Sequence, residues 1–158
     1  MGIAITSIGV KVSWAVETTA GIRPTSGYKR IHDLKELPDT NAAPNTEDAT
    51  TFDNLKNTSY VNLLSDLGGA LTIVGNLTKQ LEADWKEMCE AYATASEAGK
   101  CVWMCWDIPK ITEAVYLPIE PTELRIGGFT ANSLIEQNLY VTVLDDIERG
   151  AKPTYATT

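Results

Sequence analysis

Apolar and polar residues alternate strictly near the start of the chain. Residues 10–16 read VKVSWAV, and an alternation of period two predicts a β-strand that buries one face. A turn-rich stretch punctuated by Gly21 and Pro24 follows it. In the next segment, 28–37, three apolar residues are spaced by three, which suits a helix. The segment is short and lacks a capping residue, so we favour a second strand.

A different composition follows over residues 38–62. These 25 residues are rich in Thr, Asn, Asp and Ala, contain Pro44 and carry only scattered apolar residues. Loops of that length are uncommon inside compact domains, where they tend to be functional or disordered. We predict a long loop over 38–62, interrupted by a brief strand at 49–53. A solvated, mobile loop is the plainest alternative to a functional one.

The regular pattern returns after two consecutive glycines at 68–69. Alternation over 71–77 predicts another strand, and Thr78 is a suitable N-cap for a helix over about residues 79–98. Gly99 fits the position after the last helical turn, where a left-handed residue commonly ends a helix. The apolar positions of this helix form one stripe, which is typical of a helix laid on a sheet: Leu81, Trp85, Met88, Cys89 and Tyr92.

The last third of the chain is dominated by strand patterns. Residues 101–108 are apolar on both alternating faces, which predicts a strand covered on both sides. Short strands at 114–119 and 122–126 are expected to be broken by Pro118 and Pro121, because proline suits an edge or a bend. The longest alternation, over 134–144, predicts a strand with one buried face.

Together these elements predict a mainly β fold, a β-sandwich or barrel with one flanking α-helix at about residues 79–98. We expect a single domain over residues 1–150, with the long loop at 38–62. The remaining residues, 151–158, lack core-forming side chains, so we expect a flexible C-terminal tail.

Composition fits a globular chain: of 158 residues, 44% are apolar and 22% are charged. The balance of 13 basic against 21 acidic residues gives a net charge of −8, which disfavours a role in gripping DNA. Residues 33–66 hold seven acidic residues and two lysines, so −5 of the −8 lies on and beside the long loop. No apolar run approaches the ~18–20 residues that a membrane span needs. The first residues lack the basic and apolar regions of a signal peptide.

Reactive side chains are few: three cysteines and one histidine. On one strand, Cys101 and Cys105 would share a face about 13 Å apart, too far to bind one metal. An odd number of cysteines also argues against a disulfide framework. His32 has no serine or cysteine nucleophile motif beside it, and the glycine-rich nucleotide motifs are absent. We therefore expect no metal site, no cofactor and no catalytic residue, and hence no enzyme.

The order of segments resembles a known family. An early strand is followed by ETTAG at 17–21, then by the segment 28–37 and an acidic, threonine-rich loop with EDATTFDN at 47–54. A strand–helix unit and a closing hairpin over 118–143 complete the pattern. This order resembles the major tail (tail tube) proteins of long-tailed bacteriophages over most of residues 8–147.

The resemblance implies a structural role, in which stacked hexameric rings form a hollow tube for DNA passage into the host. The long loop would reach a neighbouring subunit or the next ring through Asp39, Glu47, Asp48, Phe52, Asp53 and Tyr60. On the two-sided strand, Trp103 and Trp106 are candidates for contacts between subunits, and Glu136 is a candidate for the lumen.

The resemblance also implies partners and a location. Besides other copies of itself, the chain would contact tape-measure, tail-tip and tail-terminator proteins, and DNA would pass as cargo without specific binding. It would reside in the phage tail of the virion after assembly in the host cytoplasm, with no membrane partner.

Two alternatives remain open. Within the structural class, the chain could be a tube or head–tail joining subunit of a contractile tail or of a related injection system. From another class, it could be a small-ligand-binding β-barrel whose pocket is lined by Trp103, Trp106 and Tyr116.

Overall fold

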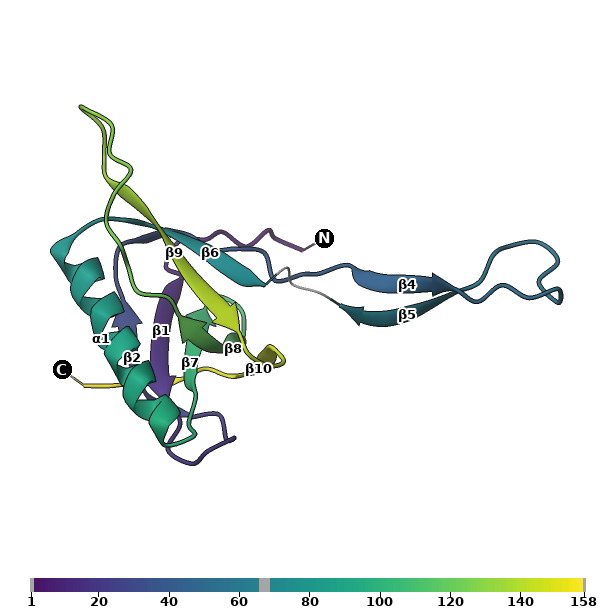
Figure 1. Ribbon diagram of the computed structural model, residues 1–158, viewed down its shortest axis with the longest axis horizontal. Helices are drawn as coiled ribbons and strands as arrows, with labels where there is room; N and C mark the ends of the chain where they lie inside the picture. Colours follow the sequence, from purple (N-terminus) through teal and green to yellow (C-terminus); the bar gives the residue numbers. More distant parts are fainter. Residues whose placement is uncertain (1, 66–68, 158) are drawn as a thin grey trace.

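Strands and a single helix make up the regular structure of a computed structural model that describes residues 2–65 and 69–157 (Figure 1). The strands are β1 (Lys11–Val16), β2 (Ser26–Ile31), β3 (Leu34–Glu36), β4 (Pro44–Asp48), β5 (Tyr60–Ser65), β6 (Ala70–Asn76), β7 (Val102–Asp107), β8 (Glu113–Pro121), β9 (Glu136–Val143), β10 (Glu148–Ala151) and β11 (Thr154–Tyr155). The helix α1 (Lys79–Glu97) lies between β6 and β7. The predicted mainly β fold with one flanking helix is confirmed.

Most strands belong to one curled sheet in the order β11-β2-β1-β7-β8-β9-β6-β3, with β10 paired to β8. Neighbouring strands are antiparallel except β11, which runs parallel to β2. The strands β4 and β5 form a separate two-stranded hairpin that extends away from this body (Figure 1). Residues 10–16, 71–77 and 134–144 are confirmed as β1, β6 and β9, with shifts of one or two residues at their ends.

The main core lies between α1 and the inner face of the curled sheet. The helix contributes Leu81, Trp85 and Met88, all fully buried, and both halves of the sheet pack against them. The Trp85 indole Nε1 also donates a hydrogen bond to the Thr122 carbonyl, at 2.8 Å. Burial of each such side chain contributes about 1.5–3 kcal/mol, so α1 is fixed to the sheet mainly by its apolar stripe.

Local signals fix both ends of α1. The Thr78 hydroxyl accepts a hydrogen bond from the Leu81 backbone N–H at 3.1 Å, as expected of an N-cap. At the other end Gly99 has a φ of 71°, which glycine adopts without steric cost. The helix ends at Glu97, one residue before the predicted end.

A second cluster covers the outer face of β1, β2, β7 and β8. It contains Tyr28, Trp103, Cys105, Ala114 and Tyr116, with Tyr155 of the C-terminal segment packed against it. Strand β7 is therefore buried on both faces, as predicted for residues 101–108.

The two tryptophans of β7 correct two of our hypotheses. Trp103 is 7% exposed in the outer cluster, whereas Trp106 is 6% exposed in the main core. Both are covered by the chain itself, so neither side chain is free for a neighbouring subunit. Residues three apart on a strand point to opposite faces, so these two side chains do not line one ligand pocket with Tyr116.

The C-terminal segment is bound to the body, contrary to the predicted flexible tail at 151–158. Within the described part, β11 pairs with β2, and Pro153 is buried. The Tyr155 hydroxyl donates to the Asp107 carboxylate at 2.8 Å, and the Lys152 ammonium forms an ion pair with the same group. A short polar sequence gains its order from these contacts with β7, which its own composition does not reveal.

The prolines also act differently from the prediction. Pro118 lies inside β8, at the point where the strand changes one of its partners from β10 to β9. The strand therefore continues to Pro121, and the strand expected at 122–126 is instead the start of a loop over residues 122–135. The segment 28–37 is divided into β2 and β3 by a bend at Asp33, whose φ is 63°.

Candidate interaction surface

The long segment predicted as a loop at 38–62 contains the β4–β5 hairpin. Thr46 pairs with Asn62 and Asp48 with Tyr60, while the predicted strand at 49–53 is part of the connecting turn region. The hairpin is solvated on both faces, so it carries no alternation of buried and exposed positions. That is why the sequence pattern did not predict strands there.

Hydrogen bonds define the shape of the hairpin tip. The Asp48 carboxylate accepts the Thr50 backbone N–H at 2.8 Å, and Ser59 N–H donates to the Thr50 hydroxyl at 2.9 Å. Further along, the Asn54 side-chain carbonyl accepts the Thr51 N–H at 2.8 Å. The hydrogen bonds from Thr50 also lower the pKa of Asp48, because they stabilise its ionised form.

The hairpin carries several large apolar side chains, and no other part of the described chain packs against them. Phe52 is fully exposed, and Leu55 and Leu64 are each 90% exposed. On β5, Tyr60 and Leu64 alternate with Val61 and Leu63, so both faces of the ribbon carry exposed apolar groups. Contiguous exposed apolar surface on a protrusion marks an interaction site.

The structure brings together most of the residues predicted for this surface. Five of them lie on the hairpin: Glu47, Asp48, Phe52, Asp53 and Tyr60. Asp39 does not, because it precedes β4 and its carboxylate accepts hydrogen bonds from the Asn41 backbone and side chain at 2.8 and 3.0 Å. The sequence reasoning missed Leu55, Val61, Leu63 and Leu64. The adjacent leucines at the end of a polar stretch were the signal that could have identified them.

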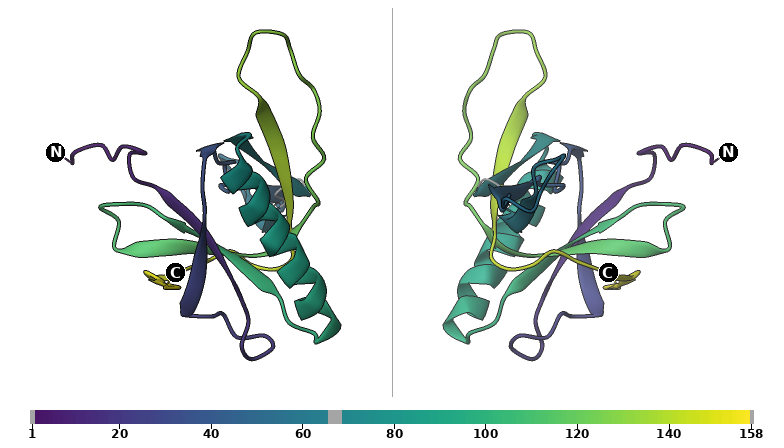
Figure 2. Two further views of the ribbon diagram at one scale, coloured as in Figure 1. Left: turned by 90° about the vertical axis from the view of Figure 1, so that its left-hand side faces the viewer. Right: turned by 90° about the vertical axis from the view of Figure 1, so that its right-hand side faces the viewer.

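A second protrusion is formed by the loop over residues 122–135, which leaves the body in another direction (Figures 1 and 2). The buried Gln137 side chain donates to the Gly127 carbonyl at 3.0 Å, so the two arms of the loop are joined near its base. Ile126, Phe129 and Leu134 are exposed on this loop. It too presents apolar groups on a shaped protrusion.

The N-terminal arm is a third exposed apolar segment. Ile3 and Ile8 are both more than three quarters exposed, and the arm leaves the body before β1 (Figure 2).

The candidate lumen residue Glu136 begins β9 and forms an ion pair with Lys35 of β3. Along the same exposed face of β6 and β9, the side chains are small or uncharged: Ala70, Thr72, Asn138, Tyr140 and Thr142. On β6 and β9 the charged residue of this face is thus Glu136, paired with Lys35, and the neighbouring strands add Glu36 opposite Val74 and Glu120 opposite Thr142.

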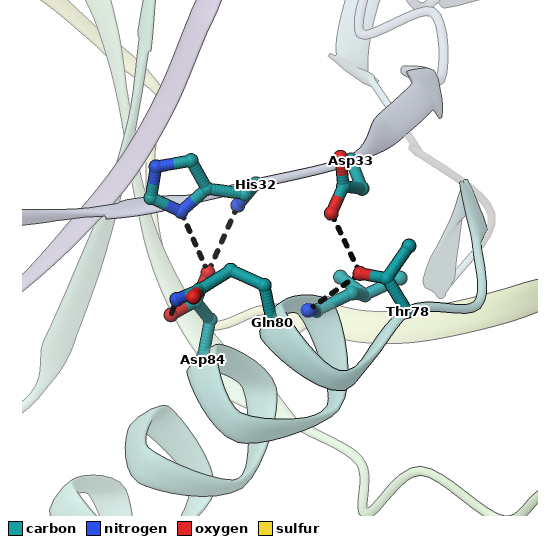
Figure 3. A network of polar contacts seen from close by, with 6 residues as sticks. His32, Asp33, Thr78, Gln80 and Asp84 are labelled. Atoms are coloured by element: carbon teal, nitrogen blue, oxygen red, sulfur yellow. Dashed lines mark hydrogen bonds and ion pairs between the residues drawn. The ribbon is translucent and has the colours of Figure 1, made fainter.

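His32 belongs to a polar network at the start of α1 (Figure 3). The buried Asp84 carboxylate accepts the His32 backbone N–H at 3.0 Å and lies 2.9 Å from His32 Nδ1. Its other oxygen accepts the Gln80 amide at 2.8 Å. One turn earlier, the Thr78 hydroxyl donates to Asp33 at 2.6 Å. These contacts fasten the bend between β2 and β3 to the helix.

In residues 2–65 and 69–157, no hydroxyl or thiol is hydrogen-bonded to the His32 ring. Burial raises the pKa of Cys89 and Cys105 to about 11, which keeps both thiols protonated and unreactive at neutral pH. Cys101 and Cys105 pack in the same outer cluster, as their spacing predicted.

Over the described ranges, no group of three or more histidine, cysteine or acidic side chains is placed to bind a metal ion. No helix in that part of the chain combines the length and the apolar character needed to cross a bilayer.

No protein-family model matches the chain, and no curated protein matches it significantly.

Proposed function

We propose that the chain is a structural subunit that polymerises as stacked rings into a phage tail tube, a conduit for DNA passage into the host. The observation that carries this proposal is the β4–β5 hairpin, which exposes apolar side chains on both faces. Burying a side chain such as Phe52 or Leu64 contributes about 1.5–3 kcal/mol. Because the hairpin is apolar on both faces, the most apolar surface is buried when it is enclosed between other copies of the chain.

The edges of the curled sheet support ring formation. In the described part of the chain, β3 pairs only with β6, so its other side presents free backbone groups. Unpaired edges are templates for further strands, and closing a ring pairs them. We propose that the β3 edge pairs with a neighbouring subunit in the same ring.

The exposed face of β6 and β9 supports passage of DNA without binding. Protein–DNA affinity depends on cationic side chains that displace counterions from phosphates. Among the described residues of this face and its neighbouring strand β3, the cation is Lys35, which is paired with Glu136. We propose that this face lines the lumen, with Glu136 as one of its residues.

Electron microscopy of the concentrated protein tests the proposal. We expect negative-stain images to show rings or tubes. A chain that stays strictly monomeric at high concentration, without rings or tubes, would contradict the proposal.

A hairpin replacement tests the observation that carries it. Pro44 and Ser65 are paired at the base of the hairpin, so residues 45–64 can be replaced by an Asn-Gly turn that joins them. The replaced segment makes no part of the core, so we expect an unchanged melting temperature and no tubes. Tubes formed by this variant would show that the hairpin is not the assembly element.

A further inference from the structure

The two shaped protrusions carry complementary charges. In the hairpin, residues 44–65 contain three acidic residues and one lysine, a net charge of −2. In the loop over residues 122–135, Glu123 lies at the base, and the remainder, residues 124–135, contains Arg125 and no acidic residue, a net charge of +1.

The charged side chains on the hairpin tip and on the loop are free to pair with another molecule. Asp53, beside the fully exposed Phe52, and Arg125, beside Ile126, are both exposed. Within residues 2–65 and 69–157 neither takes part in an ion pair. The acid nearest to Arg125 in sequence, Glu123, is also exposed, and it lies at the base of the loop, where it lines a groove with Trp85 and Cys89 of α1.

The apolar groups match as well as the charges. The hairpin tip presents Phe52 and Leu55 around Asp53, and the loop presents Ile126 and Phe129 beside Arg125. The exposed N-terminal arm is also apolar, but it has no charged side chain before Lys11. Among the three exposed apolar segments, the loop is therefore the one that combines apolar contact with the opposite charge.

The positions of the protrusions require the contact to be between molecules. The hairpin and the loop point in different directions from one body, so one copy does not bring them together (Figure 1). The two surfaces also differ from each other. A contact between two different surfaces of identical chains is head-to-tail, and its repetition generates rings or filaments.

We propose that the tip of the β4–β5 hairpin of one copy docks on the loop 124–135 of a second copy, with Asp53 of the first copy facing Arg125 of the second. This inference rests on the proposed function, because it names the contact through which copies of the chain assemble. The apolar side chains supply the contact area, and the charge pair sets its orientation and register.

A charge exchange tests the pairing. Sedimentation velocity across a concentration series is measured for the wild type, Asp53→Arg, Arg125→Glu and the double variant. We expect each single reversal to weaken association about tenfold, because like charges then face each other. The double variant restores opposite charges and should recover most of the loss. Lys110→Glu is the matched control, because it reverses an exposed cation on the turn between β7 and β8 and should associate like the wild type.

Thermal unfolding of every variant establishes that each is folded, and unchanged melting is expected because all three positions are exposed. Single reversals without effect, or a double variant no better than the single ones, would overturn the inference. Electron microscopy of the same samples reports on tubes separately. If the single-reversal variants still form tubes, the proposed function is retained and this contact is rejected. If the double variant recovers association but its oligomers are not tubes, the contact is supported and the proposed tube function is contradicted.

Discussion

The helix α1 and the β4–β5 hairpin are segments of similar length that treat their apolar side chains in opposite ways. Residues 79–97 bury Leu81, Trp85 and Met88 completely, whereas residues 44–65 leave Phe52 and Leu64 in solvent. The free energy of burial in α1 is already used to hold the monomer together. In the hairpin, the free energy of burying the apolar side chains has not been used. Association with another molecule through the hairpin would therefore bury the most apolar surface and be the most favourable.

The sharpest test of this contrast removes one aromatic side chain from each segment. Trp85→Ala should lower the free energy of unfolding by about 3–5 kcal/mol, because it leaves a cavity in the core. Phe52→Ala should change it by less than about 0.5 kcal/mol, as surface substitutions do. Urea unfolding followed by far-UV circular dichroism measures both. Similar losses for the two variants would show that the hairpin is packed in the monomer.

Buried and exposed carboxylates extend the same comparison. Glu17 is buried, and its oxygens accept the Cys101 backbone N–H at 2.6 Å and the Trp103 indole N–H at 3.1 Å. Glu17→Ala leaves both donors without a partner and should cost about 1–3 kcal/mol. Glu17→Gln keeps an acceptor and should cost less, while Asp53→Ala on the hairpin serves as the neutral control. The same urea titration measures these changes in the free energy of unfolding. Equal changes for Glu17→Ala and Asp53→Ala would contradict the prediction that the buried carboxylate contributes more.

The bound C-terminal segment should show a smaller, pH-dependent effect. Burial raises the pKa of Asp107, but hydrogen bonds from Lys152 and Tyr155 outweigh it and leave the pKa below the usual 3.8. A lowered pKa in the folded state means that the ionised carboxylate stabilises the fold above pH 3.8. This contribution is lost as the pH falls through the lowered pKa.

Asp107→Asn measures that contribution. The variant should have a lower urea midpoint than the wild type at pH 7, and the difference should shrink as the pH falls below 3.8. A difference that is the same at pH 7 and at low pH would show that the charge of Asp107 does not hold the segment.

The smallest effect is expected at the hairpin tip. Asp48→Ala removes the acceptor for the Thr50 N–H, so hydrogen exchange of that amide should become faster. The unfolding midpoint should not change, because the tip makes no part of the core. A lower midpoint for Asp48→Ala would mean that the tip supports the body.

The elements with a buried face were predictable, and those without one were not. The stripe of α1 and the alternation of β1, β6 and β9 follow from contact with one core, so their periods appear in the residues themselves. The hairpin has no buried face, and its strands were predicted as a loop. The C-terminal segment and the indole of Trp103 were misjudged because their partners, Asp107 and Glu17, are distant in sequence.

For the candidate surface, the sequence identified its place and its charge but not its form. The acidic residues around 47–53 and Phe52 were recognised, because a long polar stretch with an aromatic residue is unusual in a compact domain. The leucines of β5 and the loop 122–135 were missed. Whether an apolar side chain is buried depends on which distant segments of the chain pack against it, and the neighbouring residues in the sequence do not reveal this.

The sequence by itself determined the mainly β class, the position and ends of α1, and the concentration of acidic charge around one long segment, because periodicity, capping and charge are local properties. Only the tertiary structure decided that this segment is a hairpin held in solvent, that both tryptophans of β7 are covered by the chain, and that a second apolar protrusion carries Arg125. These facts depend on long-range packing, which determines which side chains are covered and which remain free to meet another molecule.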